Sequence, residues 1–451
     1  MKKLLLTVLL FANLYIYANT INRENECNQK QAQEYASIAH KYHFGENIKI
    51  DFFKAAKYYT KLCDCKYSMG CSALGAMHYR GDGVTQDNNK SIHFFTKACE
   101  YGAYYICLDV AEKYLIGKNI KQDKTKAIYF YNKGCDNNES KGCQKLGDIY
   151  LEGDGIEKNV TKAIDYYSKA CDANVSNACL KAGIIFSYNQ NIKQDYNKSI
   201  YFYTKACDLN NSKGCLYLGY KSIHKSITTQ SLFQSEKYFT KACILNDAEG
   251  CLNAGLLFID ESALPIDFKK SENFFTKACD GDMSDACFRL GLMNENGNGI
   301  KNNYKKAFGF YKQACKSNDM RACYNLANLY YHGKGVKQDY KMAQKYYEIT
   351  DKNSFYQGTF TLGMMYMRGK GVIKNYSKAA KFFEKSCNNG YLKSCNNLAI
   401  IYANGIGKDI DYNKAYKLFN KACDGGLEEA CKTAKVMQDN KKYDINKTKK
   451  K

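Results

Sequence analysis

The stretch YTKACDLNNSKGCLYLG, residues Tyr203–Gly219, places a cysteine at the end of a helix-like segment, then a short polar turn, then a second cysteine. Near copies end at Gly183 (YSKACDANVSNACLKAG) and at Gly291 (FTKACDGDMSDACFRLG). The two cysteines, eight positions apart, recur with a period of 36 residues that is interrupted by one step of 72. The ten pairs are Cys63 and Cys71, Cys99 and Cys107, Cys135 and Cys143, Cys171 and Cys179, Cys207 and Cys215, Cys243 and Cys251, Cys279 and Cys287, Cys315 and Cys323, Cys387 and Cys395, Cys423 and Cys431. So regular a repeat predicts an array of like units, each packed on its neighbours.

Hydrophobic spacing divides one repeat into two helices. Apolar residues at helical intervals predict a first helix over Met320–Tyr331, and Gly333 and Gly335 end it because glycine tolerates the positive φ of a helix exit. Asp339 is the expected N-cap of a second helix, Tyr340–Ile349. Two helices in every 36 residues, with no strand pattern, predict an all-α fold, an α/α solenoid of about eleven repeats.

A small residue stands in the middle of most of the predicted first helices. We expect it to let the paired helix approach closely, because a larger side chain there would hold the two helices apart. The residues are Gly75, Gly147, Gly183, Gly219, Gly255, Gly291, Ala327, Gly363 and Ala399.

Each cysteine pair is expected to form a disulfide across the turn between a second helix and the next first helix. A closed loop of about nine residues contributes about 2.5 kcal/mol in the chain-entropy model. The interrupted repeat supports local pairing, because Asp351 and Thr359 replace both cysteines together. Two cysteines remain, Cys27 and Cys65. We predict a Cys27–Cys65 disulfide that ties the first repeat to the second; a free thiol or an intermolecular bond is the alternative.

The chain begins with a segment typical of export signals, MKKLLLTVLLFANLYIYANT. Lys2 and Lys3 precede an apolar run, Leu4–Leu14, that is short for a membrane span. We predict a cleaved signal peptide at residues 1–18, a repeat solenoid at residues 19–437 and a basic, disordered tail at residues 438–451. The mature chain would then have no transmembrane segment and would be secreted or periplasmic, where disulfides persist.

The net charge of +22 is spread along the array rather than clustered. Recurring lysines on one helix of the repeat favour a solvated face, and a nucleic-acid partner is not expected. These lysines are Lys126, Lys162, Lys198, Lys270, Lys306, Lys378 and Lys414. A C-x7-C spacing is not a metal-ligand pattern, so neither a metal nor a cofactor is expected.

Two stretches, LGAMHYRGDGVTQDNNKSIHFFTKA (Leu74–Ala98) and LGMMYMRGKGVIKNYSKAAKFFEKS (Leu362–Ser386), resemble Sel1-like repeats, relatives of the tetratricopeptide repeat. With its C-x7-C pairs the chain is similar, over about residues 27–437, to the Helicobacter cysteine-rich proteins. The resemblance implies right-handed superhelical stacking and a concave surface lined by the first helices. It also implies two kinds of biochemistry, because members of that family are described as penicillin-binding proteins or slow β-lactamases on a protein-binding scaffold.

The residues themselves support recognition better than catalysis. A serine β-lactamase needs a Ser-x-x-Lys nucleophile, a Ser/Tyr-x-Asn element and a Lys-Ser/Thr-Gly strand. The chain contains Ser222-Ile-His-Lys225 and Ser187-Tyr-Asn189, but the third element is missing and no HxHxD zinc cluster is present. No catalytic residue is therefore assigned. Binding and slow hydrolysis of β-lactams, with a role in antibiotic resistance, stays the alternative function.

A solenoid binds ligands through positions that vary between otherwise regular units. Two such rows run along the predicted first helices. The first row is Lys145, Lys181, Tyr217, Asn253, Arg289, Asn325, Thr361 and Asn397. The second row, seven residues further on, is Arg80, Glu152, His224, Asp260, Asn296, His332, Arg368 and Asn404.

Both rows are expected on the concave face. We predict a protein, peptide or glycan ligand, from the cell wall or from a host, because amides pair with peptide backbones and arginines with carboxylates. Solvated polar residues without a ligand are the alternative interpretation. The candidate binding residues are Asn253, Arg289, Asn325, His332, Arg368, Asn397 and Asn404.

One further pattern concerns modification. An acidic residue, any residue, asparagine, any residue and Ser/Thr follow one another at seven places, in an arrangement that resembles the extended acceptor motif of bacterial N-glycosylation. The asparagines are Asn89, Asn138, Asn159, Asn174, Asn197, Asn210 and Asn446.

Overall fold

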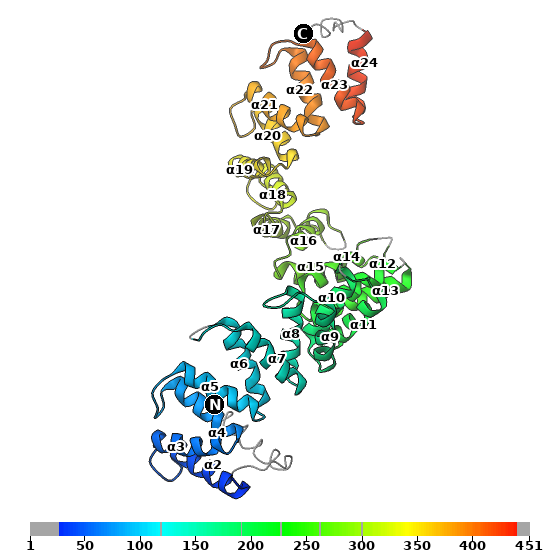
Figure 1. Cartoon of the computed structure of the whole chain (residues 1–451). Coiled ribbons are helices and arrows are strands. Elements are labelled where there is room, and N and C mark those ends of the chain that lie inside the picture. The colour runs from blue at the N-terminus through cyan, green and yellow to red at the C-terminus, as the bar shows by residue number, and fades with distance from the viewer. Residues whose placement is uncertain are drawn as a thin grey trace. The chain divides into compact units, whose positions relative to one another are not determined.

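The computed structural model describes residues 27–117, 120–190, 192–225, 228–260, 263–298 and 301–439, and all regular structure within them is helical (Figure 1). None of the described helices is both long and apolar enough to cross a membrane. The predicted signal peptide, residues 1–18, lies outside the described residues, as does all of the predicted tail after Asp439, where the last helix ends.

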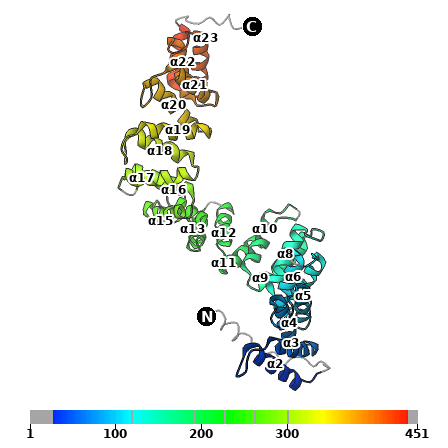
Figure 2. The same cartoon turned by 90° about the vertical axis from the view of Figure 1, so that its left-hand side faces the viewer.

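The chain divides into two units, residues 1–209 and 210–451. In each unit, helices follow one another in chain order and pack on their sequence neighbours (Figures 1 and 2). Even-numbered helices are the predicted first helices, called A helices below, and odd-numbered ones are B helices. Unit 1 contains α2 (Gln29–Phe44), α3 (Phe52–Asp64), α4 (Ser68–Arg80), α5 (Asn88–Glu100), α6 (Tyr104–Ile116), α7 (Lys124–Asp136), α8 (Ser140–Glu152), α9 (Val160–Asp172), α10 (Ser176–Tyr188) and α11 (Tyr196–Asp208). Unit 2 contains α12 (Ser212–Lys225), α13 (Thr229–Ile244), α14 (Ala248–Leu257), α15 (Phe268–Asp280), α16 (Ser284–Asn296), α17 (Tyr304–Lys316), α18 (Met320–His332), α19 (Tyr340–Lys352), α20 (Tyr356–Arg368), α21 (Tyr376–Asn388), α22 (Leu392–Asn404), α23 (Tyr412–Asp424) and α24 (Glu428–Asp439).

Local chemistry sets the helix ends. Asp339 caps α19 by accepting from the backbone N–H of Met342, as predicted, and Gly333 ends α18 with φ 67°. The predicted second helix was too short, because α19 continues past Ile349 to Lys352. Apolar spacing fades in that last turn, yet the helix continues to the joint with the next repeat.

The mid-helix small residue lies beneath a buried aromatic ring of the following B helix. A Cβ on Gly183 would lie 2.6 Å from the ring of Tyr203, and a Cβ on Gly291 would lie 2.4 Å from the ring of Tyr311. Both distances are shorter than carbon atoms tolerate, so the glycine is what allows the ring to lie flat against the A helix. The predicted close approach is confirmed, and the approaching group is an aromatic side chain.

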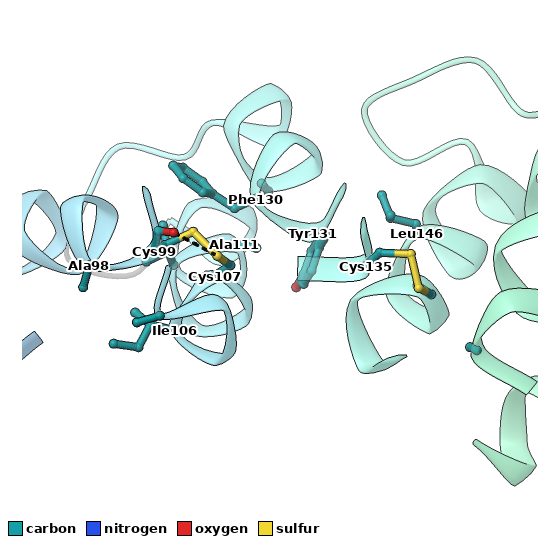
Figure 3. Close-up of a cluster of buried hydrophobic side chains, with 14 of the residues drawn as sticks. Ala98, Cys99, Ile106, Cys107, Ala111, Phe130, Tyr131, Cys135 and Leu146 are labelled. Atoms are coloured by element: carbon teal, nitrogen blue, oxygen red, sulfur yellow. Dashed lines mark hydrogen bonds between the residues drawn. A yellow bond between two sulfur atoms is a disulfide. The ribbon is translucent and has the colours of Figure 1, made fainter. Parts of the chain in front are cut away.

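Disulfides join the C-x7-C pairs across the B-to-A turns, with Cα atoms 4.5–5.0 Å apart. Figure 3 shows Cys99 and Cys107 of one bonded pair in a cluster of buried side chains, together with Cys135, which is bonded to Cys143. Cys207 ends unit 1 and Cys215 begins unit 2, so their pairing stays a prediction. Cys27 is bonded to Cys65, which ties the start of the first repeat to the second. So many disulfides fit an oxidising, extracytoplasmic location.

One joint within unit 2 is held without a disulfide. Thr359 Oγ1 donates a hydrogen bond to Asp351 Oδ1 at 2.6 Å, in the place of the cysteine pair. Lys385 Nζ, from the next B helix, lies 2.7 Å from the same carboxylate oxygen. A polar contact therefore replaces the covalent bond at the α19–α20 joint.

The recurring lysines are exposed, and most of them lie over an aromatic ring of the preceding A helix. Lys162 Nζ is 5.2 Å from the ring centroid of Tyr150, and Lys414 Nζ is 4.5 Å from that of Tyr402. Such cation–π contacts, with the lysine stems covering apolar surface, account for the regular charge without a polyanionic partner.

Candidate ligand-binding face

The side chains of the two predicted rows on the A helices differ in their exposure to solvent. First-row side chains are half-buried, except that of Lys145, which is exposed. Second-row residues fall at or just after the C-terminal ends of the A helices, and those whose side chains the structure describes are exposed.

Several first-row side chains bond to the preceding A helix of their unit. Each of these contacts spans 33 residues. They are Lys181 Nζ to Asp148 Oδ1 at 2.6 Å, Asn253 Nδ2 to Tyr220 Oη at 2.8 Å, and Asn397 Nδ2 to Met364 Sδ at 3.3 Å. This row therefore ties successive repeats together, and its polar groups are partly used within the protein.

The other first-row candidates also have partners. Arg289 Nε lies 2.7 Å from Asp285 Oδ2, and its guanidinium is 6.0 Å from the ring centroid of Phe275. The side-chain amide of Asn325 acts on the hydroxyl of Tyr311, whose pKa it lowers against the larger effect of burial. Arg289 and Asn325 are thus held in place by their surroundings.

Hydroxyls of buried B-helix tyrosines reach the same A-helix surface. The bonds are Tyr167 to Asp148 at 2.6 Å, Tyr203 to Ser187 at 3.0 Å, Tyr311 to Glu295 at 2.6 Å and Tyr347 to Asn328 at 2.6 Å. Burial raises the pKa of Tyr167, Tyr311 and Tyr347 well above its usual value, so these phenols remain hydrogen-bond donors.

Tyr131 differs from these tyrosines. Its hydroxyl is buried and has no hydrogen-bond partner among the described residues. Burial, followed by the nearby charge of Glu112, raises the pKa of Tyr131 to about 12.

Asp285 is the centre of an ion-pair cluster between α16 and α18. It accepts from Arg289 and, at 2.7 Å, from Arg321 Nη2, which also pairs with Asp319. Burial opposes ionisation of Asp285, but the hydrogen bonds from Arg289 and Arg321 outweigh it and lower the pKa of the carboxyl.

A carboxyl whose pKa is lower in the folded state stabilises the fold above its unfolded pKa, and that contribution disappears as the pH falls through the folded value. Asp285→Asn is therefore expected to reduce the free energy of unfolding by about 1 kcal/mol at pH 7, a discounted value for a partly exposed pair. The difference from the wild type should begin to shrink as the pH falls below about 4, where the unfolded carboxyl takes up its proton, and should vanish only below the lowered pKa of the folded state. Urea titrations of both proteins at pH 7 and pH 3.5 measure this difference in the free energy of unfolding. An equal difference at the two pH values would show that the ionised carboxylate of Asp285 does not stabilise the fold.

The second row supplies exposed side chains. The side chains of Arg368, at the end of α20, and Asn404, at the end of α22, form no hydrogen bond or ion pair with any residue that the structure describes. His332 ends α18, also exposed, and its ring lies edge-on to that of Tyr331, with centroids 4.9 Å apart. Of the remaining members, Arg80 pairs with Asp82 at 3.3 Å, and the side chain of His224 lies outside the description.

Exposed apolar side chains also lie on the A helices, and the candidate binding residues chosen from the sequence did not include them. On α22, Ile400 lies between Asn397 and Asn404 and is 39% exposed. On α6, Tyr105 and Ile116 are 59% and 61% exposed. The signal was present in the sequence, because these apolar residues occupy outward positions of otherwise amphipathic helices.

The serines of the catalytic alternative are engaged in ordinary contacts. Ser222 Oγ donates to the backbone carbonyl of Leu218 in its own helix at 2.9 Å. Ser187 is buried and accepts from Tyr203. Ser187 and Ser222 belong to different units, and the side chain of Lys225 is not among those described. No group of three or more His, Cys, Asp or Glu residues is arranged to hold a metal ion in the described part of the chain. These contacts lend no support to β-lactam hydrolysis.

Solved structures resemble this chain to different degrees. The protective antigen c5321 of uropathogenic Escherichia coli, which displays an SLR fold, is 22% identical with a TM-score of 0.67, covering 94% of this chain and 92% of that chain. A Sel1 repeat protein from Oxalobacter formigenes is 23% identical (TM-score 0.41; 46% of this chain, 87% of that chain). Helicobacter pylori cysteine rich protein B is 27% identical (TM-score 0.21; 38% of this chain, 97% of that chain).

No curated protein sequence matches the chain. The sequence model of the Sel1 repeat, in contrast, matches it nine times, at residues 30–67, 68–102, 106–139, 140–175, 176–211, 284–319, 321–349, 359–391 and 392–427. These matches cover more than half of the chain, and they fall on the A and B helices described above. The protein therefore belongs to the Sel1 repeat family.

Proposed function

We propose that this protein is an exported, disulfide-rich scaffold that recognises an extended segment of a partner polypeptide along the A helices of unit 2. Sel1 repeats generally mediate protein interactions. The observation that carries the proposal is the contrast between the two rows in unit 2: most first-row side chains are bonded within the protein, whereas the side chains of Arg368 and Asn404 are exposed and free of partners among the described residues. Free polar side chains, repeated at one register, are available to a ligand.

The chemistry of this surface fits a peptide. The amide of Asn404 can both donate to and accept from a peptide backbone, and the guanidinium of Arg368 can hold a carboxylate in a bidentate contact. Ile400 adds an apolar contact between Asn397 and Asn404. A mixed polar and apolar strip of this kind is typical of peptide-binding surfaces. A glycan ligand, from the cell wall or a host, is the outcome to be distinguished by experiment.

Export is part of the proposal. Residues 1–18 have the charged and apolar segments of a signal peptide, and the disulfides need an oxidising compartment. The mature chain would act in the periplasm or outside the cell.

The test is a binding measurement with matched variants. The oxidised mature chain is immobilised, partners are captured from culture medium or host-cell lysate, and the affinity of each purified partner is measured for the wild type and for Arg368→Ala/Asn404→Ala. We expect the double variant to bind about 10- to 30-fold more weakly, the loss typical of a contact residue at the centre of an interface. Lys381→Ala, an exposed change on the B helix α21, should leave the affinity unchanged.

Pretreatment of the captured partner separates the two ligand classes. Protease treatment should abolish binding, and glycosidase treatment should leave it intact; the reverse result would contradict peptide recognition. Equal losses for the double variant and for Lys381→Ala would show that this face is not the site. Turnover of a chromogenic cephalosporin by the oxidised protein that is lost in Ser222→Ala would contradict the scaffold-only function.

A further inference from the structure

We propose that the side-chain amides of Asn138 and Asn174 are N-glycosylation sites. Both lie in the exposed turns between a B helix and the next A helix of unit 1. Both are the centre of an acidic-x-Asn-x-Ser motif, with Asp136 and Ser140 around the first and Asp172 and Ser176 around the second. An Asn-x-Ser/Thr acceptor requires an exported chain and an accessible loop.

The backbone at both positions has the left-handed conformation of a tight turn. Asn138 and Asn174 have φ values of 68° and 63°, in the left-handed region that asparagine tolerates better than most residues. Their peptide N–H groups donate to the carbonyls of Cys135 and Cys171, which fixes the turn. Their side-chain amides are exposed and form no hydrogen bond with the residues that the structure describes. The nucleophilic nitrogen is therefore accessible.

The serine two residues on is half-buried in both motifs, and its hydroxyl has no internal partner among the described residues. Ser140 begins α8 and Ser176 begins α10, and neither forms a side-chain hydrogen bond within the described structure. An enzyme that recognises the serine hydroxyl of the motif could therefore bind it without first breaking a hydrogen bond within the protein. Attachment at Asn138 would also place the glycan at the opposite end of α8 from the second-row residue Glu152, about 20 Å away along a 13-residue helix, and would leave that end uncovered.

Where the same motif lies at the start of a helix, its asparagine and its serine or threonine have different surroundings. Asn89 and Asn197 lie inside the first turns of α5 and α11, and the serine of each motif is buried and bonded: Ser91 to the Gly75 carbonyl, Ser199 to the Tyr196 carbonyl, both at 2.8 Å. Asn159 uses its own side-chain oxygen to cap α9. These three asparagines are not expected to be modified. The motif at Asn210 spans the boundary between the units and that at Asn446 lies outside the described residues, so the proposal rests on neither.

The array contains its own controls. Asn246 and Asn318 adopt the same left-handed turn, with φ 63° and 62°, and are exposed. Neither has a Ser or Thr two residues on. The turn alone explains asparagine at these positions, so modification at Asn138 and Asn174 must depend on the additional motif residues.

The reaction is a glycosyl transfer. The donor is an oligosaccharide joined through its anomeric carbon to a lipid diphosphate. The bond from that carbon to the diphosphate oxygen breaks, the diphosphate leaves with the electron pair, and the anomeric carbon bonds to Nδ2 of the asparagine. The amide loses one proton to a base of the transferring enzyme, and no oxidant or reductant is needed.

Mass spectrometry of peptides from the full-length protein, purified from its own source, tests the proposal. Peptides that contain Asn138 and Asn174 should each carry one added oligosaccharide mass, and those with Asn246 and Asn318 should carry none. Ser140→Ala, which leaves the left-handed turn intact, should abolish the addition at Asn138 and spare Asn174. Unmodified peptides at both sites, or a glycan retained in Ser140→Ala, would overturn the proposal.

A gain-of-function variant tests the turn itself. Ile244→Asp with Ala248→Ser moves the complete motif onto the turn at Asn246, and Ile244 is 68% exposed, so the change is tolerable there. The variant should gain one glycan at Asn246, while the Cys243–Cys251 disulfide, detected in the same peptide map, reports that it has folded. No gain in a correctly bonded protein, or occupancy at Asn89 and Asn197 equal to that at Asn138, would show that the turn does not select the site.

Discussion

Replacing Phe383 with alanine is expected to lower the free energy of unfolding by about 3–5 kcal/mol. Phe383 on α21 is fully buried, and its ring lies directly over Gly363 of α20, where a Cβ would come within 2.6 Å. The ring of Phe360 lies beside it, with centroids 5.7 Å apart. Glycine has no side chain that could fill the space, so most of the cavity would persist.

Urea denaturation followed by circular dichroism measures this change, and hydrogen exchange locates it, because repeat arrays can unfold locally. Phe53→Ala is the matched control, since Phe53 is 73% exposed, and it should change the free energy of unfolding by less than about 0.5 kcal/mol. A loss below 1 kcal/mol for Phe383→Ala would mean that the ring and the glycine are not a tightly packed pair.

Installing the missing disulfide is expected to stabilise the array by about 2 kcal/mol. Asp351→Cys with Thr359→Cys places cysteines in the two positions that are already joined by a hydrogen bond of 2.6 Å. A bond that closes a loop of about nine residues contributes about 2.5 kcal/mol in the chain-entropy model, and loss of the exposed contact with Lys385 costs less than about 1 kcal/mol.

Asp351→Ser with Thr359→Ser is the matched control for the loss of the polar contacts, and it should be slightly less stable than the wild type. Peptide mapping without reductant establishes that the new bond has formed, and urea denaturation of the oxidised proteins compares their stabilities. If the bonded variant is no more stable than the serine control, the α19–α20 joint does not have the geometry of the other joints.

Local chemistry could be predicted because its partners are close in the sequence. The C-x7-C disulfides, the glycine at the centre of the A helix and the aspartate cap of α19 all follow from residues within one repeat. The partner of Cys27 did not follow in this way, because Tyr35 occupies its partner position in the repeat. A bond to Cys65, a free thiol and an intermolecular bond were all compatible with the sequence. The structure bonds it to Cys65, 38 residues away.

The sequence by itself determined the period, the helix pairs and the turns, since each depends on backbone preferences and contacts within about 36 residues. Only the tertiary structure decided how the two rows differ. Asn397 and Asn404 are seven residues apart on one helix face, yet Asn397 reaches Met364 of the preceding A helix and Asn404 is exposed. That difference depends on how successive A helices stack, which is a property of helix packing and not of either residue.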